Sequence, residues 1–173
     1  MTLSLYTATV PAFRQIVDSL AAFVAKGEAF AESSGIDPET LVTAKLAPDM
    51  LGFAYQVKSV AVHSVGAIAG VRKGEFAPDM TPPPTDFAAL HALLAETSAT
   101  LAAIDPAEVD GFVGGDMAFV FREHRVPYLA EDFLLSFSLP NFYFHATTAY
   151  DILRWKGVPL GKRDFIGRPR VRA

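Results

Sequence analysis

The amino-acid sequence predicts an all-α fold: an up-down four-helix bundle with a small β-hairpin before the last helix, formed by a single domain over residues 1–173. Three observations lead to this expectation. Long segments carry apolar residues at alternating spacings of three and four, which is the period of an amphipathic helix. Short segments rich in proline, glycine and aspartate separate them. One stretch near residue 120 places aromatic and β-branched residues on both sides of a charged turn, which is typical of a hairpin.

The first helix is expected from about Leu5 to Phe30. Its inner stripe repeats at spacings of four and three and consists of Tyr6, Val10, Phe13, Val17, Leu20 and Val24. Gly35 suits the end of this helix, because glycine adopts the left-handed conformation that stops helices. Asp37-Pro38 is typical of a cap followed by a first-turn proline, and it predicts a short helical piece.

The second long helix is expected to begin at Pro48-Asp49 and to run to about Val71. It carries few charges on any side, so we expect it to be covered on more than one face, inside the bundle or at a subunit contact. The segment GEFAPDMTPPPTD that follows is a predicted loop, because its three consecutive prolines lack backbone donors and forbid a helix. Thr85 is the predicted N-cap of the third helix. The inner stripe of that helix is Phe87, Leu90, Leu94, Leu101 and Ile104.

The hairpin is expected at roughly Ala118–Arg122 against Val126–Leu129. The fourth helix should begin between Glu131 and Leu139. Pro140 then either kinks this helix or starts a new one at its first turn. Gly157 and Pro159 end the helix, and a basic tail follows.

Composition narrows the classes of function. Fifteen basic and nineteen acidic residues give a formal charge of −4, so the basic footprint of nucleic-acid binding is missing and we expect no nucleic-acid partner. The chain has no cysteine, which excludes thiol nucleophiles and thiolate metal sites within it. Hydrophobic residues make up 51% and charged residues 20%, so the surface is rather apolar and we expect a homodimer.

Two further features bear on location. The first residues, MTLSLYTATVPAF, lack the positive and apolar regions of a secretion signal. The longest uncharged run, Phe133 to Tyr150, contains too many polar residues to span a membrane comfortably. We therefore expect a cytoplasmic protein without a membrane partner.

Histidines are the first candidates for chemistry, because they titrate near neutrality. The four lie far apart and form no HxxxH or HExxH pair: His63, His91, His124 and His145. Helical metal sites commonly use ligands at i and i+3 or i+4. The positions four before and four after His145 are Asn141 and Ala149, and neither is a strong ligand. His91 is expected on the flank of the third helix, and His124 is expected to be solvated in the hairpin turn.

Polar residues on the second and fourth helices predict a pocket between them. Gln56 and His63 share one side of the second helix with small or polar neighbours, which indicates a pocket wall or, as the more frequent case, close helix packing around a satisfied histidine. His145 lies on the inward stripe of an unusually polar helix, which must therefore meet a polar network or a ligand cavity. The candidate pocket residues are Gln56, His63, Asn141, His145 and Thr148. The candidate metal ligands are His63 and His145.

The block PNFYFHATTAYDILRWKGVPLGKRDFIG, from Pro140 to Gly167, resembles the bacterial family catalogued as domain of unknown function 1993. That family carries a similar PNF-F/Y-FH-x-TTAY-x-ILR block that closes on GK-x-DF-hydrophobic-G. LAPDM at Leu46–Met50 and the following Gln56-Val57 also resemble the family's second-helix entry. The resemblance implies membership of the wider DinB/YfiT-like superfamily of four-helix bundles, which are often dimeric.

The same resemblance implies chemistry. Many superfamily members are metalloenzymes with one histidine on the second helix and two, spaced HxxxH, on the last, and some are thiol-dependent transferases. Carried over, His63 stands near the helix-two ligand and His145 near one ligand of the last helix, while the remaining ligand has no match. Two hypotheses remain. One is a dimeric bundle with a polar pocket that binds a small ligand. The other is a metal-dependent transferase or hydrolase that uses a divalent metal, zinc or nickel, at His63, His145 and an unidentified third ligand.

Overall fold

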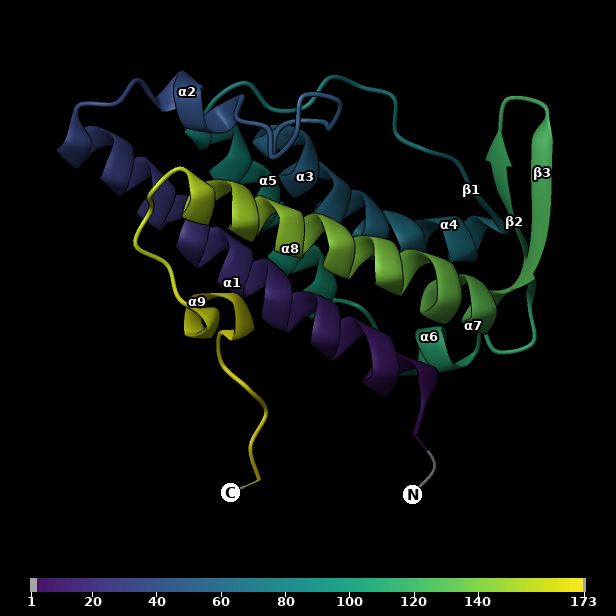
Figure 1. Cartoon of the computed structure of the whole chain (residues 1–173). Coiled ribbons are helices and arrows are strands. Elements are labelled where there is room, and N and C mark those ends of the chain that lie inside the picture. Colours follow the sequence, from purple (N-terminus) through teal and green to yellow (C-terminus); the bar gives the residue numbers. More distant parts are fainter. Residues whose placement is uncertain (1–2, 173) are drawn as a thin grey trace.

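The structure is a computed structural model that describes residues 3–172. It is mostly helical, with a small three-stranded sheet at one end (Figure 1). Its main helical segments are α1 (Leu5–Ser34), α3 (Phe53–Ala61), η1 (Val62–Gly66), α4 (Ala67–Lys73), α5 (Phe87–Ala102), η2 (Phe133–Ser138) and α8 (Leu139–Trp155). The short helices are α2 (Pro38–Val42), α6 (Pro106–Asp110), α7 (Ala130–Asp132) and α9 (Lys162–Ile166). The strands are β1 (Glu75–Phe76), β2 (Asp116–Phe121) and β3 (His124–Leu129).

The long helices pack side by side around one core. α1 packs along α5 and also meets α8, while α3 packs along α8 and also meets α5. In Figure 1 the sheet lies at the end of the helices where α4 and α7 are found, and α9 folds back onto α1. Five phenylalanines are completely buried between these helices: Phe13, Phe23, Phe53, Phe133 and Phe142. Burial of side chains of this size stabilises the fold by ~2–3 kcal/mol each.

The limits of α1 follow from its sequence. It begins after Ser4, whose side chain accepts the backbone N–H of Thr7, and it ends at Gly35, which has a φ of 64°. The predicted stop is therefore confirmed, although the helix continues to Ser34. Within the predicted inner stripe, Val10 to Val24 are buried and Tyr6 is partly buried.

Two predicted helix starts were wrong. Pro48-Asp49 lies in a turn, and the second long helix begins at Phe53, whose N–H donates to the carbonyl of Ala44. The third helix is capped by Asp86 rather than Thr85, because the Asp86 carboxylate accepts the N–H of Ala89 at 2.7 Å. A carboxylate suits this position, since it also compensates the positive end of the helix dipole.

Two π-helical turns interrupt the second and fourth helices. η1 joins α3 to α4, and η2 joins α7 to α8 without a break. Pro140 therefore stands in the first turn of α8, directly after η2. Proline has no backbone N–H, so it cannot donate a hydrogen bond to the carbonyl one turn earlier. A π turn is one way in which a continuous helix accommodates the missing hydrogen bond.

The sheet contains one strand that the sequence did not reveal. The predicted hairpin is confirmed as β2 and β3, paired antiparallel from Asp116–Leu129 to Phe121–His124. β1 was expected to be loop, yet it pairs in parallel with β2 and sets Phe76 beside Phe119. This close packing requires glycine at Gly70 of α4, because a Cβ there would lie 2.9 Å from the Cβ of Phe76. The chain is therefore not purely α-helical.

Candidate functional site

The antiparallel pairing of the second and fourth helices brings their polar residues together. Nδ1 of His145 lies 2.7 Å from Oε1 of Gln56, and Nδ1 of His63 lies 3.4 Å from Oγ of Ser138. Gln56 and His63 are seven residues, or about two turns, apart on α3–η1, and Ser138 and His145 are seven residues apart on η2–α8. The two contacts therefore lie next to each other between these helices. They place the imidazole rings of His63 and His145 in a stack with centroids 5.7 Å apart.

The hydrogen bonds of Gln56 determine which nitrogen of His145 carries the proton. The Nε2 group of Gln56 donates to the carbonyl of Leu51 at 2.8 Å, so Oε1 must be the atom that faces His145. An amide oxygen only accepts hydrogen bonds. Nδ1 of His145 is therefore the donor, and its Nε2 keeps a free lone pair.

Ser138 has the corresponding role at His63. Its buried hydroxyl donates to the carbonyl of His63 at 3.1 Å, which satisfies a backbone oxygen of the η1 turn. Because the hydroxyl hydrogen is used there, Oγ can only accept from Nδ1 of His63. His63 therefore has the same tautomer as His145, with its lone pair on Nε2.

Burial keeps both rings uncharged near neutral pH. Desolvation lowers the pKa of His145 from 6.5 to about 4. Desolvation, and in second place the charge of His145, lowers the pKa of His63 from 6.5 to about 4. Two adjacent imidazoles with unprotonated Nε2 atoms are suited to accept hydrogen bonds or protons, or to ligate a cation.

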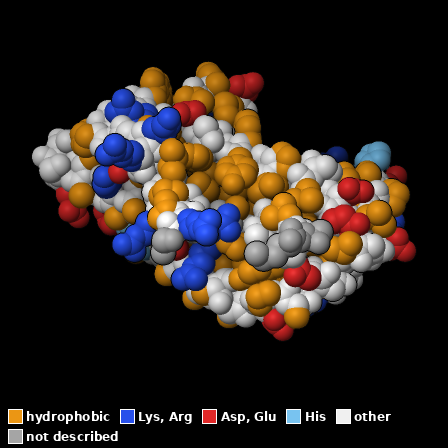
Figure 2. Space-filling model, turned by 90° about the horizontal axis from the view of Figure 1, so that it is seen from below, with side chains coloured by type: hydrophobic (Ala, Val, Ile, Leu, Met, Phe, Trp, Pro, Cys, Tyr) orange, Lys and Arg blue, Asp and Glu red, His pale blue; other side chains and the backbone are white. Residues whose placement is uncertain are grey.

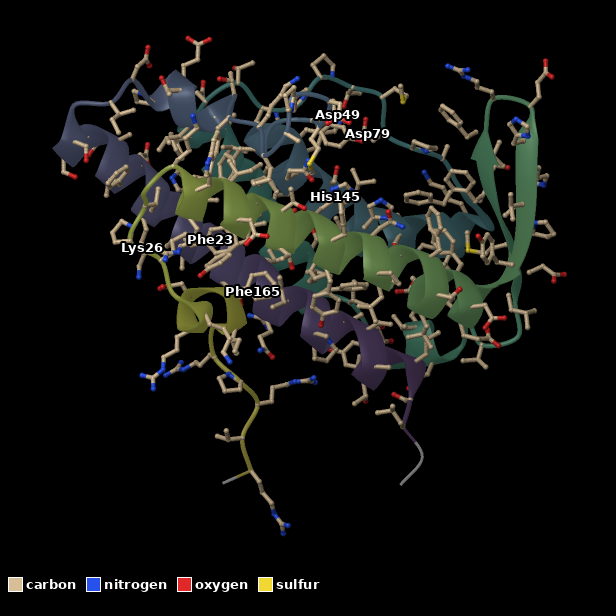
Figure 3. The ribbon with its side chains drawn as sticks, viewed as in Figure 1. Phe23, Lys26, Asp49, Asp79, His145 and Phe165 are labelled. Atoms are coloured by element: carbon tan, nitrogen blue, oxygen red, sulfur yellow. The ribbon has the colours of Figure 1, made fainter. Side chains whose placement is uncertain are left out.

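His63 and His145 line a cavity of about 210 Å³ between the two helices and the sheet. Its polar lining consists of Tyr55, Lys58, Ser59, His63, Asp79, Asn141 and His145, and its apolar lining of Val62, Phe76, Pro78, Phe119 and Phe137. Figure 3 shows His145 on the side of α8 that faces α3, with Asp79 on the connecting segment above it. The cavity is therefore polar on its helical side and aromatic where the sheet closes it.

The sheet contributes the aromatic wall. Phe76 of β1 and Phe119 of β2 both pack on Phe137 of η2, with ring centroids 6.4 and 5.0 Å away. Tyr128 of β3 packs on Phe137 and Phe133 from the same side. The small sheet therefore positions the aromatic rings that close this end of the cavity.

An ion pair between a buried lysine and an exposed aspartate fixes the loop that forms one edge of the cavity. The ammonium of Lys58 lies 3.1 Å from the carboxylate of Asp79 and also bonds the hydroxyl and carbonyl of Thr81. Burial raises the pKa of Asp79, but hydrogen bonds from Thr81 and Lys58 and the Lys58 charge outweigh it and hold the pKa below 3.8. All three donor hydrogens of Lys58 therefore have partners in this loop.

The structure brings four of the five predicted pocket residues together. Gln56 is buried beneath His145, while His63, Asn141 and His145 line the cavity. The fifth, Thr148, is buried and donates to the carbonyl of Phe144 on its own helix. His91 and His124 lie outside the cavity: His91 bonds Glu28 on the flank of α5, and His124 is exposed at the start of β3.

Sequence reasoning did not identify Tyr55, Lys58, Asp79 or the aromatic wall as part of this site. Tyr55 and Lys58 lie close to Gln56 on the helix that was predicted to form one wall of the pocket. This position was the feature of the sequence that could have identified them. Phe76 and Phe119 reach the site through the pairing of β1 with β2, and a two-residue strand leaves no periodicity in a sequence.

A metal held by three protein ligands does not fit the residues that are present. Catalytic zinc sites normally use three such ligands. In residues 3–172, no group of three or more histidine, aspartate or glutamate side chains lies close enough to hold a metal ion. Gln56 and the amide nitrogen of Asn141 are engaged with Leu51, His145 and Phe137. His63 and His145 thus form a two-nitrogen site without a third histidine, aspartate or glutamate beside it in residues 3–172.

The basic C-terminal segment is a separate surface. Its side chains are exposed: Lys162, Arg163, Arg168, Arg170 and Arg172. Figure 2 shows the face that carries α1 and α9, with Lys and Arg side chains gathered on one half of it. α9 is held there by the pairing of Lys26 with Asp164 and by the packing of Phe165 on Tyr150, beside Phe23 (Figure 3).

No helix within the described part of the chain is both long and apolar enough to cross a membrane.

The helical fold is DinB-like, and comparison with known proteins gives the family. Residues 5–166 match the family model described as "Domain of unknown function (DUF1993)", and the chain belongs to this family. A crystal structure of a DinB family member protein from Shewanella denitrificans is similar over 98% of this chain and 95% of that chain, with 28% sequence identity and a TM-score of 0.81. No curated protein sequence matches the chain. The resemblance seen in the C-terminal block is thus confirmed.

Proposed function

We propose that this protein binds a small molecule in the cavity between α3–η1 and η2–α8. The observation that carries the proposal is the convergence of His63 and His145 on one cavity, each with its Nε2 lone pair left without a protein partner within residues 3–172. Two acceptor nitrogens that open onto one cavity, beneath an aromatic wall, have the character of a ligand site.

An up-down four-helix bundle of the DinB type is the framework of this proposal. It is supported by the packing of α1 with α5 and α8, and of α3 with α5 and α8. A homodimer belongs to the proposal as well. Its support is the outer side of α8, where Phe144 and Trp155 are 56% and 62% exposed and lie three turns apart on one side of the helix.

The chain contains its own control for a binding experiment. Its four histidines give four separate Cε1–H signals in an NMR spectrum, two from the cavity and two from outside it. A set of uncharged aromatic fragments is expected to shift the signals of His63 and His145 and to leave those of His91 and His124 in place. Fragments that bind without shifting the signals of His63 and His145 would contradict the proposal.

The alternative, a metal-dependent transferase or hydrolase, makes a different prediction. It requires a third ligand that no described histidine, aspartate or glutamate supplies beside His63 and His145. Elemental analysis of the purified protein, together with its melting temperature before and after chelation, separates the two functions. A stoichiometric divalent metal whose removal lowers the melting temperature would favour the alternative.

A further inference from the structure

The two histidines provide the cavity with two acceptor nitrogens. Nε2 of His63 and Nε2 of His145 accept only, because Nδ1 carries the hydrogen in both rings. Asn141 donates one amide hydrogen to the carbonyl of Phe137 at 2.7 Å, which leaves its Oδ1 as an acceptor and its second amide hydrogen as a donor. A ligand that pairs with the two histidine nitrogens must therefore bring donor hydrogens.

Ser59 adds a hydroxyl, which can both donate and accept a hydrogen bond, to the same cavity. Its side chain lines the cavity and is only 5% exposed, yet its hydroxyl makes no hydrogen bond to any residue in the described range 3–172. Serine hydroxyls on helices commonly bond the carbonyl one turn earlier, as Ser64 does with Val60 in the next turn. The Ser59 hydroxyl is thus free to pair with a group inside the cavity.

The charges around the cavity favour an uncharged ligand. Among the described residues of its lining, Lys58 and Asp79 are the charged pair, and they neutralise each other at 3.1 Å. The Lys58 ammonium has no hydrogen to spare for an anion, and the Asp79 carboxylate already accepts from Lys58 and Thr81. A charged ligand would thus lose its hydration without gaining a counter-charge.

The opposite wall accepts an apolar ring. Phe76, Phe119 and Phe137 face the cavity from three different elements, and their three pairs are stacked, edge to face and tilted. An aromatic ligand placed against them gains both buried area and ring–ring contacts.

We infer that the cavity recognises a neutral aromatic molecule that carries a hydrogen-bond donor, such as a hydroxyl, which it presents to the Nε2 atoms of His63 and His145 while its ring rests on Phe76, Phe119 and Phe137. This inference rests on the proposed function, and it adds the chemical class of the ligand. The cavity should reject an analogue whose donor is methylated, because that ligand buries the Nε2 atoms of both histidines without a hydrogen-bond partner.

A matched pair of probes tests the donor. The ¹⁹F NMR titration uses 4-fluorophenol and 4-fluoroanisole, which share a ring and differ in one donor hydrogen. 4-Fluorophenol is expected to bind about tenfold more tightly, the effect of one hydrogen bond to a buried acceptor. Equal affinities would overturn the donor inference and leave the binding cavity in place. If neither probe binds and neither shifts the His63 and His145 signals, the proposed function fails with it.

Charged probes and two variants complete the test. Tighter binding of 4-fluorobenzoate or 4-fluorobenzylammonium than of 4-fluorophenol would overturn the inference of a neutral ligand. Ser59→Ala and His145→Gln should weaken 4-fluorophenol binding by about threefold to tenfold and leave the anisole unchanged. Ser33→Ala, an exposed serine on α1, is the matched control and should change neither probe. A loss of both probes in Ser59→Ala, with an unchanged melting temperature, would contradict a role for its hydroxyl in donor recognition.

Discussion

Gln56 is a buried amide with both ends engaged, and its position decides the state of His145. One end donates to Leu51 at 2.8 Å, and the other accepts from Nδ1 of His145 at 2.7 Å. Because the amide cannot turn without losing the first bond, it holds the imidazole in one tautomer. This arrangement resembles the general way in which a second residue fixes the ring orientation of a functional histidine.

Replacement of Gln56 by methionine tests this role. The change keeps the length of the side chain, removes both hydrogen bonds and should lower the free energy of unfolding by about 1–3 kcal/mol. It should also convert His145 from the Nδ1–H form to a mixture of both tautomers, measured from the ¹⁵N shifts of its ring. Gln15→Met is the matched control, since Gln15 lies on α1, outside the cavity, and donates to the carbonyl of Ile166. A wild-type tautomer in Gln56→Met would refute the role of the amide.

The two cavity histidines should make stability depend on pH in a defined window. Each has a folded pKa of about 4, below the 6.5 of the unfolded chain, so the unfolded state binds more protons between these values. The stabilisation is complete above pH 6.5 and is lost as the pH falls towards 4. After allowance for partial exposure, each ring contributes roughly 2 kcal/mol to this loss.

Urea unfolding at pH 7, 5.5 and 4 measures the effect. The double variant His63→Gln/His145→Gln is expected to show a flatter dependence between pH 6.5 and 4 than the parent protein. The carboxylates and the outer histidines His91 and His124 are common to both proteins, so they cancel in the comparison. Parallel curves would show that the cavity rings titrate normally.

Among the structural elements, the loop between β1 and α5 is held by one ion pair of unequal burial. The side chain of Lys58 is 7% exposed and that of Asp79 is 38% exposed. Asp79→Asn leaves a buried ammonium without its counter-charge, whereas Lys58→Met leaves a carboxylate that water can reach. We therefore expect Asp79→Asn to lower the free energy of unfolding by about 2–4 kcal/mol, and Lys58→Met by less.

Chemical denaturation of the two variants measures this difference. Asp49→Asn is the control, because Asp49 lies in an equivalent APDM sequence in an exposed turn. An equal loss of stability in Lys58→Met and Asp79→Asn would show that the pair acts as a surface salt bridge.

The elements also show what the sequence could predict. The apolar stripes predicted the core positions of α1 and α5, and Gly35 predicted the end of α1, because these signals are local. The π turns η1 and η2 were not predicted, since a single shifted hydrogen bond leaves the 3.6-residue pattern almost intact. Gln56, His63 and His145 were found because a polar residue on an apolar stripe is conspicuous. Phe76 and Asp79 were missed because only long-range pairing brings them to the cavity.

At the scale of the whole molecule, the cavity depends on elements that are far apart in the chain. α3 and η1 supply one wall, η2 and α8 supply the facing wall, and the sheet closes the end between them. The Lys58–Asp79 pair fixes the remaining edge. The site is therefore a product of the complete fold, and no single segment of the chain contains it.

The outer side of α8 leads to the last prediction, which concerns assembly. Phe144 and Trp155 each leave more than half of their surface exposed to solvent, and aromatic residues of this kind are the usual anchors of protein interfaces. We expect the protein to sediment with twice the 18.6 kDa mass of one chain at micromolar concentration. Phe144→Lys and Trp155→Lys should each raise the dissociation constant by roughly tenfold or more. Val171→Lys, at an exposed position of the C-terminal segment, should leave it unchanged. A wild-type protein that remains at the mass of one chain throughout the concentration range would refute the dimer, while the predictions for the cavity, which use residues of a single chain, would stand.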